Sequence, residues 1–482
     1  MIPLLIAAYA SPLPYQQTLE KALENDARVQ RAALTVESAA IGVRASYGVF
    51  DPNAGFSGNW RTSQQKGFFQ GFPFESSSRT WNLGANLGGT LPTGTGYQLD
   101  ASMDRNYSSF VTDFGVGGLN EQIQDAYTSR LAVTLTQQLL RGIKPGFNLQ
   151  NVTVAKQVLT SAELRAVEAS QETLSAAAKA YWSWVYQREL VGIAREGMDQ
   201  AKEALRVGDL QLGAGEIAPL ERTRLSAAEV QSRVTLMDAE LAERAALQNL
   251  LSLIGEDPGQ AVAGHTFEPD AVPDTPPSMV DPEAAIEAAL TGNPGLQVAR
   301  MALDDAEVNL GLKRHARLPS LAANVSAGIQ AQDDTLGQAI TGLAEDQAFP
   351  YLSVGADFSM PIGNRAARGA AKQASVEVDQ RRLDVEELER TIRIAVLAQI
   401  ETVNAGALRL ELAQSNVALA EESLAAEEAL QEAGRSIQRN LLDARVQLTR
   451  SQGDLVKART DHAAALVELQ RLQGRLTTSS SL

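Results

Sequence analysis

Side chains that commonly carry chemistry are scarce in this sequence or lie far apart. The three histidines are His265, His315 and His462, and none has a second ligand at the spacing of a metal site. The chain has no cysteine, which excludes disulfides, zinc–thiolate sites and a lipid-carrying N-terminal cysteine. Its carboxylates lie mostly on repetitive helical faces, where they are expected to be solvated. The sequence therefore predicts no catalytic residue, no metal site and no cofactor, and an enzyme is the least favoured of three functional hypotheses.

Charge and hydropathy limit the partners that the chain can have. Its net charge of −16 makes nucleic acid a poor partner. The charge is consistent with simple solubility and equally with a lumen that favours cations. No apolar run approaches the ~20 residues of a membrane helix, so insertion into a bilayer would require a barrel. Residues 1–14 are interpreted as a signal-peptide remnant or N-terminal extension, because residues 2–10 are apolar and end in Ala8-Tyr9-Ala10.

The sequence contains two copies of one plan. A shift of 267 residues aligns Glu20, Ala22, Leu23 and Pro52 with Glu287, Ala289, Leu290 and Pro319. A shift of 219 residues aligns Gly215, Ser232, Leu250 and Gly255 with Gly434, Ser451, Leu469 and Gly474. The two offsets differ by 48, so the first copy has about 48 extra residues between Pro52 and Gly215.

Each copy is predicted to run from a helix through strands to a very long helix, a tip and a return helix. The copies span residues 15–254 and 283–474, with a proline-rich equatorial linker at 255–282 and a flexible C-terminus at 475–482. The first helices, 15–50 and 282–317, stop before Pro52 and Pro319. The remaining elements are strands at about 53–139 and 321–360, long helices at 149–212 and 366–433, tips at 213–219 and 434–440, and return helices at 219–254 and 436–472.

The long helices are too long for a compact domain. At 1.5 Å per residue, the helix at 149–212 would span roughly 95 Å. Leucine and small residues recur every seven positions along the return helices, as in Leu441, Leu448 and Leu455. This period predicts antiparallel coiled-coil packing.

Segments with period-two alternation predict strands. Four lie in the first copy, at 53–61, 80–91, 96–106 and 128–138, and two in the second, at 321–331 and 350–360. Alternation alone fits a soluble sandwich or a membrane barrel. A polar, glycine-rich face, long predicted loops at 62–79 and 108–126, and a short turn at 92–96 favour the barrel. Aromatic residues near the strand ends are expected to lie at the membrane interface; they are Trp60, Trp81, Tyr107 and Tyr127.

Six strands cannot close a pore within one chain, because about eight are a practical minimum. The barrel must therefore be shared between chains. Six strands per chain, 18 in a trimer, are favoured over four. The alternative for the extra hairpin is an external or periplasmic flap.

The segments around the tips and strand ends carry a family resemblance. They are residues 206–208, 215–221 and 434–444 at the tips, and 137–142 and 360–363 at the ends of strands. In order and spacing they resemble the TolC-like family of outer-membrane efflux and secretion channels (outer membrane factors). The resemblance implies a homotrimer in the Gram-negative outer membrane that extends into the periplasm. Its partners would be the lipid bilayer, a periplasmic adaptor protein and an inner-membrane pump.

The resemblance also implies a gate at the periplasmic tips. In relatives, acidic groups there pair with arginine and tyrosine, and by spacing Glu221 and Asp443 match the acidic positions. Ser436 and Gln431 stand at the arginine and tyrosine positions, so that arrangement is not preserved. The arginines that would substitute are Arg222, Arg435 and Arg439. The expected adaptor contacts are Gly215, Glu216, Ile217, Gly434, Arg435 and Ser436, although both tips lack the family's usual Gly-Leu pair.

The predicted fold is an α+β membrane protein with a coiled-coil α-barrel and a transmembrane β-barrel. The predicted function is a passive outer-membrane exit duct of a tripartite efflux pump or a type I secretion system. The alternative is a structural or adhesive trimeric coiled coil without transport. Cargo, adaptor class and resting state of the gate have no signature in the sequence.

Overall fold

The computed structural model describes residues 11–113, 118–215, 217–262, 267–270, 279–345, 348–433, 435 and 438–478. The chain forms two compact units, each built from segments that are distant in sequence. The first comprises Met1–Ser38, Thr160–Ala302 and Arg382–Leu482, and the second comprises Ala39–Leu159 and Leu303–Arg381. Residues 1–10, which carry most of the predicted N-terminal extension, lie outside the described residues.

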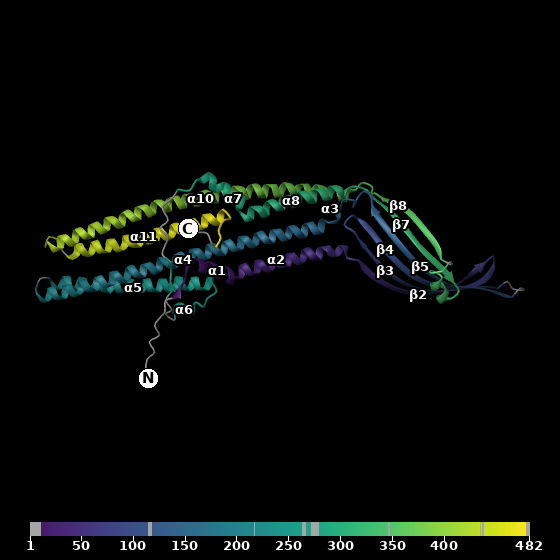
Figure 1. Ribbon diagram of the computed structural model, residues 1–482, viewed down its shortest axis with the longest axis horizontal. Coiled ribbons are helices and arrows are strands. Elements are labelled where there is room, and N and C mark those ends of the chain that lie inside the picture. The colour runs from purple at the N-terminus through teal and green to yellow at the C-terminus, as the bar shows by residue number, and fades with distance from the viewer. Residues whose placement is uncertain are drawn as a thin grey trace, which may run out of the picture. The chain divides into compact units, whose positions relative to one another are not determined.

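Four long helices follow the prediction to within two residues. They are α4 (Gln150–Gly213), α5 (Pro219–Leu253), α10 (Arg365–Glu432) and α11 (Gln438–Leu472). Each is rich in alanine, leucine, glutamate, glutamine and arginine, which are strong helix formers. α4 runs antiparallel beside α5, and α10 beside α11 (Figure 1). Among the described residues, every helix falls short of the combined length and apolarity that crossing a membrane requires.

The two first helices are each interrupted, so the predicted unbroken helices at 15–50 and 282–317 were wrong. The observed elements are α1 (Tyr15–Asn25), α2 (Ala27–Ser46), the 3-10 turn η1 (Tyr47–Phe50), α7 (Pro282–Gly292) and α8 (Pro294–His315). Asp26 and Asn293 have extended backbones at the two breaks. Their side-chain oxygens accept hydrogen bonds from the amides of Arg28 and Leu296, which caps the helices that follow.

The return helices end on glycines that touch these breaks. Gly255 and Gly474 have φ angles of 73° and 68°, which favour glycine. The side-chain amide of Asn25 donates to the carbonyl of Ile254 over 2.8 Å. That of Asn293 donates to the carbonyl of Leu472 over 3.3 Å. Similar joints therefore connect α1 to α5 and α7 to α11.

An aromatic cluster forms the core of the helical unit. Tyr181, Trp182 and Trp184 on α4 are almost completely buried, and Tyr15 of α1 stacks on Trp182 with ring centroids 5.1 Å apart. The Trp184 indole donates to Glu243 on α5 over 3.2 Å. The cluster thus joins three helices that are far apart in sequence.

The linker is more structured than predicted. It contains the short helix α6 (Gly259–Val262), which is confined between Pro258 and Pro269. A two-residue strand, β6 (Phe267–Glu268), pairs in parallel with β1 (Ser11–Pro12). Ala261 is buried in the core of the helical unit, and Phe267 packs against it.

The second unit contains one six-stranded antiparallel sheet in the order β2-β3-β4-β5-β7-β8. Its strands are β2 (Asn53–Phe69), β3 (Phe72–Thr90), β4 (Thr95–Asp113), β5 (Leu119–Gln138), β7 (Ser320–Asp333) and β8 (Phe349–Ser359). Two short helices, α3 (Pro145–Asn148) and α9 (Leu336–Thr341), lie in its connections.

The long loops predicted at 62–79 and 108–126 were wrong. β2 and β3 continue as one hairpin to a tight turn at Gln70 and Gly71, whose positive φ angles are typical of a type I′ turn. β4 and β5 pair as far as Asp113 and Leu119. These segments are rich in serine and glutamine, which resembles loop composition, but ladder hydrogen bonds do not require apolar side chains.

A partly buried ion network gives the helical unit a testable pH dependence. Glu468 on α11 accepts hydrogen bonds from Lys179 (2.7 Å) and Ser175 (3.0 Å) of α4 and from Arg471 (2.6 Å). Burial alone would raise the pKa of Glu468, but the bonds from Arg471 and Lys179 outweigh it and lower the pKa to about 2. The ionised carboxylate therefore stabilises the folded unit above the ordinary glutamate pKa, and this contribution is lost as the pH falls toward 2.

Glu468→Gln is expected to lower the unfolding free energy at pH 7 by about 1–3 kcal/mol. It should also flatten the loss of stability between pH 5 and pH 2. Denaturant titrations followed by tryptophan fluorescence would measure both effects. Glu196→Gln is the matched control, because Glu196 bonds only its helical neighbour Gln200 over 3.4 Å among the contacts found in the described residues. Equal pH profiles for Glu468→Gln and the unmodified protein would contradict the assignment.

Candidate functional site

One face of the sheet is an exposed apolar band. Residues opposite one another on neighbouring strands form a register row, and a central row runs through Leu87, Leu99, Val133, Ala327 and Leu352. Leu99 is 42% exposed and Leu352 is 70% exposed. A soluble sheet would bury such a face against other elements. The band therefore needs an apolar environment from outside this chain.

The four predicted interface aromatics lie together along one edge of this band. Trp60, Trp81 and Tyr127 share one register row, and Tyr107 lies in the next row on the same face. The rings of Trp81 and Tyr127 meet edge to face, with centroids 6.0 Å apart. Strand pairing thus assembles an aromatic row from residues up to 67 positions apart in the sequence.

Two charged residues that the sequence analysis did not identify belong to this aromatic row. Arg105 lies in the row itself and makes two hydrogen bonds with Asp125, of 2.9 and 2.8 Å. Its guanidinium lies 5.2 Å from the centroid of the Tyr127 ring. Both residues lie within predicted strand or loop segments, and only the strand register reveals that they meet.

The opposite face of the sheet is polar. It carries small and amide side chains with acidic groups among them, including Asn82, Asn86, Asp100, Asp104, Thr134, Asn324 and Asp357. Asn82 donates to Asp104, and Asn324 donates to Asp357, across neighbouring strands. One face thus suits lipid, and the other suits water.

The first helical tip is held by ion pairs within its own hairpin. α4 ends at Gly213, Gly215 has a φ of 78°, and α5 begins at Pro219. Arg222 pairs with Asp209 of α4 over 2.9 Å. Glu221 pairs with Arg224, one helical turn further along α5, over 3.3 Å.

Part of the predicted tip set can be placed. Ile217 is half-buried. Its Cδ1 atom lies near the position that a Cβ atom would occupy on Gly208. Arg435 is exposed, and its amide donates to the carbonyl of Leu430 at the end of α10. Glu216, Gly434 and Ser436 lie outside the described residues, as does the side chain of Arg439. No contact among the described residues joins Glu221 to Asp443.

The second hairpin has a related ion pair, between Arg445 of α11 and Glu428 of α10, at 3.3 Å. Glu428 lies 219 residues after Asp209, which is the second offset of the predicted repeat. Sequence reasoning missed both acids. They could have been found by pairing residues that lie at equal distances before and after each turn, because the two antiparallel helices of a hairpin bring such residues together.

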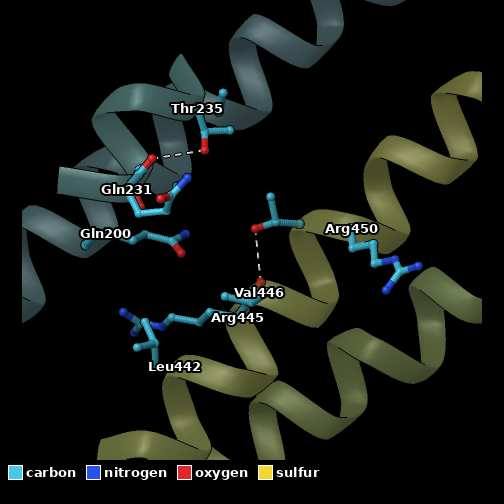
Figure 2. Close-up of a pocket in the computed structure, with 12 residues that line it drawn as sticks. Gln200, Gln231, Thr235, Leu442, Arg445, Val446 and Arg450 are labelled. Atoms are coloured by element: carbon cyan, nitrogen blue, oxygen red, sulfur yellow. Dashed lines mark hydrogen bonds between the residues drawn. The ribbon is translucent and has the colours of Figure 1, made fainter. Parts of the chain in front are cut away.

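A cavity of about 350 Å³ lies between the two hairpins within the helical unit. Its lining residues are Ala194, Gly197, Gln200, Ala201, Gln231, Ser232, Thr235, Leu442, Arg445, Val446, Thr449 and Arg450. Figure 2 shows Gln200 and Gln231 on one hairpin facing Arg445 and Val446 on the other. Among the described residues, no group of histidine, aspartate or glutamate side chains could hold a metal ion.

Comparisons with known proteins give consistent results. A family model described as "Outer membrane efflux protein" matches residues 285–475. Outer membrane efflux protein BepC from Brucella suis is 24% identical over 357 residues, which cover 73% of each chain. Pyoverdine export outer membrane protein OpmQ from Pseudomonas aeruginosa is 25% identical over 308 residues, covering 62% of this chain and 59% of the relative.

Solved structures share the fold. The outer membrane protein VceC from Vibrio cholerae has a TM-score of 0.62 at 14% identity, covering 95% of this chain and 96% of VceC. CusC has a TM-score of 0.64 at 15% identity, covering 95% and 92%. The Campylobacter jejuni CmeC outer membrane channel has a TM-score of 0.61 at 14% identity, covering 97% and 87%.

Proposed function

Because the chain belongs to the TolC-like outer membrane efflux protein family, we propose that three copies form a passive exit duct. The duct would serve a tripartite efflux pump or a type I secretion system. A periplasmic adaptor and an inner-membrane pump would supply the energy, so this chain needs no catalytic residue. Its strands would form the pore in the outer membrane, and its helices would extend the conduit into the periplasm.

The observation that carries this proposal is the exposed apolar band with its aromatic edge. On β7 the apolar face runs from Leu321, opposite Phe358, to Ala331, which is itself buried but lies in the same register row as the exposed Leu83 and as Met103. Ten residues at about 3.3 Å each, tilted by about 40°, span roughly 25 Å along a membrane normal. That height matches the apolar band of outer-membrane barrels.

The open edges of the sheet support a shared barrel. β2 and β8 each pair on only one side among the described residues. Lipid offers no hydrogen bonds to the unpaired edges, so within a membrane they must pair with other chains. Three chains would contribute 18 strands, and β8 of one chain would pair with β2 of the next.

Exposed apolar stripes on the helices support the same assembly. On α5 the stripe contains Val230, Val234, Met237 and Leu241, and on α10 it contains Leu397, Leu408, Leu412 and Leu419. These spacings keep the residues on one side of a helix. A neighbouring copy would cover them in a ring of coiled coils.

The internal repeat explains how one chain would contribute two similar segments to the wall of the proposed tunnel. The helix breaks at Asp26 and Asn293 and the terminal glycines Gly255 and Gly474 recur at the two sequence offsets of 267 and 219 residues. Duplication of one helix–strand–helix plan would give each subunit two pairs of tunnel helices.

Detergent-purified protein reconstituted into planar bilayers tests the proposal. We expect a particle with the mass of a trimer and discrete single-channel currents, together with loss of an export phenotype on deletion. A trimer without currents would support the structural or adhesive alternative. A monomer that is freely soluble without detergent would refute both.

The tip residues give a prediction in the same assay. Glu221→Lys or Asp443→Lys is expected to raise single-channel conductance, because each would weaken charge pairing that holds the periplasmic entrance shut. Glu196→Lys is the control and should leave conductance unchanged, since Glu196 is not a gate candidate and bonds only Gln200 of its own helix among the contacts found in the described residues. Conductance equal to that of the unmodified protein in both single variants would remove these residues from the gate.

A further inference from the structure

Four strands of the sheet continue well past the aromatic row. The last pair between β5 and β7 joins Tyr127 to Asp333. Beyond it, segments 62–69, 72–79, 107–113 and 119–125 pair only with one another and form what we call the distal blade. β7 and β8 do not extend alongside the blade in the described residues. The blade is therefore a four-stranded extension carried by each copy.

The polar face of the sheet becomes aromatic at the end of this blade. Side chains on a strand alternate between faces, so Phe72 and Phe74 share the face of Asn82, and Phe110 shares the face of Asp104. Phe74 and Phe110 stack with ring centroids 5.1 Å apart and an interplanar angle of 26°. Among the residues whose side chains the structure describes, the other positions on this face of the blade are polar or glycine; they include Ser63, Gln65, Ser76, Ser78, Ser108, Gln122 and Gln124. We call Phe72, Phe74 and Phe110 the distal cluster.

Gly67 makes room for the distal cluster. It lies opposite Phe74 in the register, and a Cβ atom on Gly67 would approach the Phe74 ring to 2.7 Å. The ring can therefore extend over β2 only because position 67 has no side chain. This fit holds the Phe74 ring in place on the polar face, stacked on Phe110.

The blade is long enough to reach the axis of the proposed pore. Eighteen strands 4.8 Å apart, tilted by about 40°, enclose a circle of roughly 18 Å radius. Eight residues of strand extend about 26 Å beyond the aromatic row. A blade inclined inward by about 45° would bring its distal cluster close to the axis.

We propose that the distal clusters of three copies pack together over the outer mouth of the duct and form an apolar gate. The inference depends on the proposed trimeric duct. A narrow apolar constriction excludes water and ions by dewetting, so the gate would limit leakage while no cargo passes. The partner of each distal cluster is thus a second copy of this chain.

Disulfide crosslinking tests the contact directly, because the chain has no cysteine. Under mild oxidation, Phe72→Cys should give covalent dimers of the purified trimer that reduction reverses. The matched control is Phe68→Cys, since Phe68 lies near the same end of the blade on the opposite face and is 79% exposed. Phe68→Cys should remain uncrosslinked. Absence of dimers from Phe72→Cys, or equal yields from both variants, would overturn the proposal.

A conductance measurement separates the gate from the duct. Phe74→Ser/Phe110→Ser is expected to raise single-channel conductance at least about twofold, because polar side chains rewet the constriction. If the unmodified protein forms no conducting trimer, the proposed duct itself fails. If it conducts as a trimer and the double variant conducts equally, the gate alone is refuted.

Discussion

Replacing Leu99 with arginine is expected to remove nearly all assembled protein from the outer membrane. Leu99 lies near the middle of the apolar band, between Leu87 and Val133 in its register row. An arginine facing lipid near the midplane costs about 2–4 kcal/mol in a membrane barrel. Each chain would thus lose a factor of about 30 to 700 in its assembly equilibrium, and a trimer carries the substitution three times.

Gln98→Arg is the matched control, because Gln98 is adjacent on the same strand but faces the polar side. Its side-chain amide donates to Asp100 over 2.7 Å, and an arginine there could pair with the same carboxylate. We expect this variant to assemble normally. Quantitative blotting of folded trimer in isolated outer membranes would compare the two. Equal assembly of both variants would show that the apolar band does not face lipid.

The long helices were predictable because their signals are local. Helix-forming composition and the absence of internal proline predict α4 and α10 closely. Glycine also marks the turns that follow α4 and α5, because Gly215 and Gly255 have positive φ angles. The breaks at Asp26 and Asn293 were missed although Pro294 follows one of them. Aspartate and asparagine are compatible with a helix interior, and only their capping hydrogen bonds reveal the break.

The sheet shows a different limit. Its apolar strands were predicted from alternation, but the distal halves of β2 to β5 contain serine and glutamine on both faces and resemble loops in composition. Pairing to a neighbouring strand determined their structure. The aromatic row was predicted as four separate residues near strand ends, and the register then placed them side by side.

The tip residues were the least predictable part of the site. The sequence analysis sought partners for Glu221 and Arg222 among residues of the two return-helix starts. The structure pairs Arg222 instead with Asp209, which precedes the turn on α4. Antiparallel packing within a hairpin therefore competes with contacts between hairpins for the same charged groups. Resemblance to a family cannot show whether a charged group pairs within its hairpin or between hairpins when the charged residues differ from those of the family.

Gly474→Ala is expected to destabilise the helical unit severely, by more than about 3 kcal/mol. Gly474 has a φ of 68°, and a Cβ atom there would approach the carbonyl oxygen of Gly292 to 2.1 Å. Backbone surrounds the position, so no flexible side chain can move aside. Denaturant unfolding followed by tryptophan fluorescence would measure the loss. Gly192→Ala is the control, since Gly192 lies inside α4 with open space around it, and alanine there should stabilise by up to about 1 kcal/mol.

The corresponding glycine of the first copy should tolerate the same change better. Gly255 has a φ of 73°, but its new methyl group would meet the Asn25 side chain at 2.5 Å instead of a backbone carbonyl. Asn25 can change rotamer at the cost of its hydrogen bond to the Ile254 carbonyl. We therefore expect Gly255→Ala to lose less stability than Gly474→Ala. Equal losses would mean that the positive φ, which the two glycines share, and not the close packing of the two backbones, determines the need for glycine at these joints.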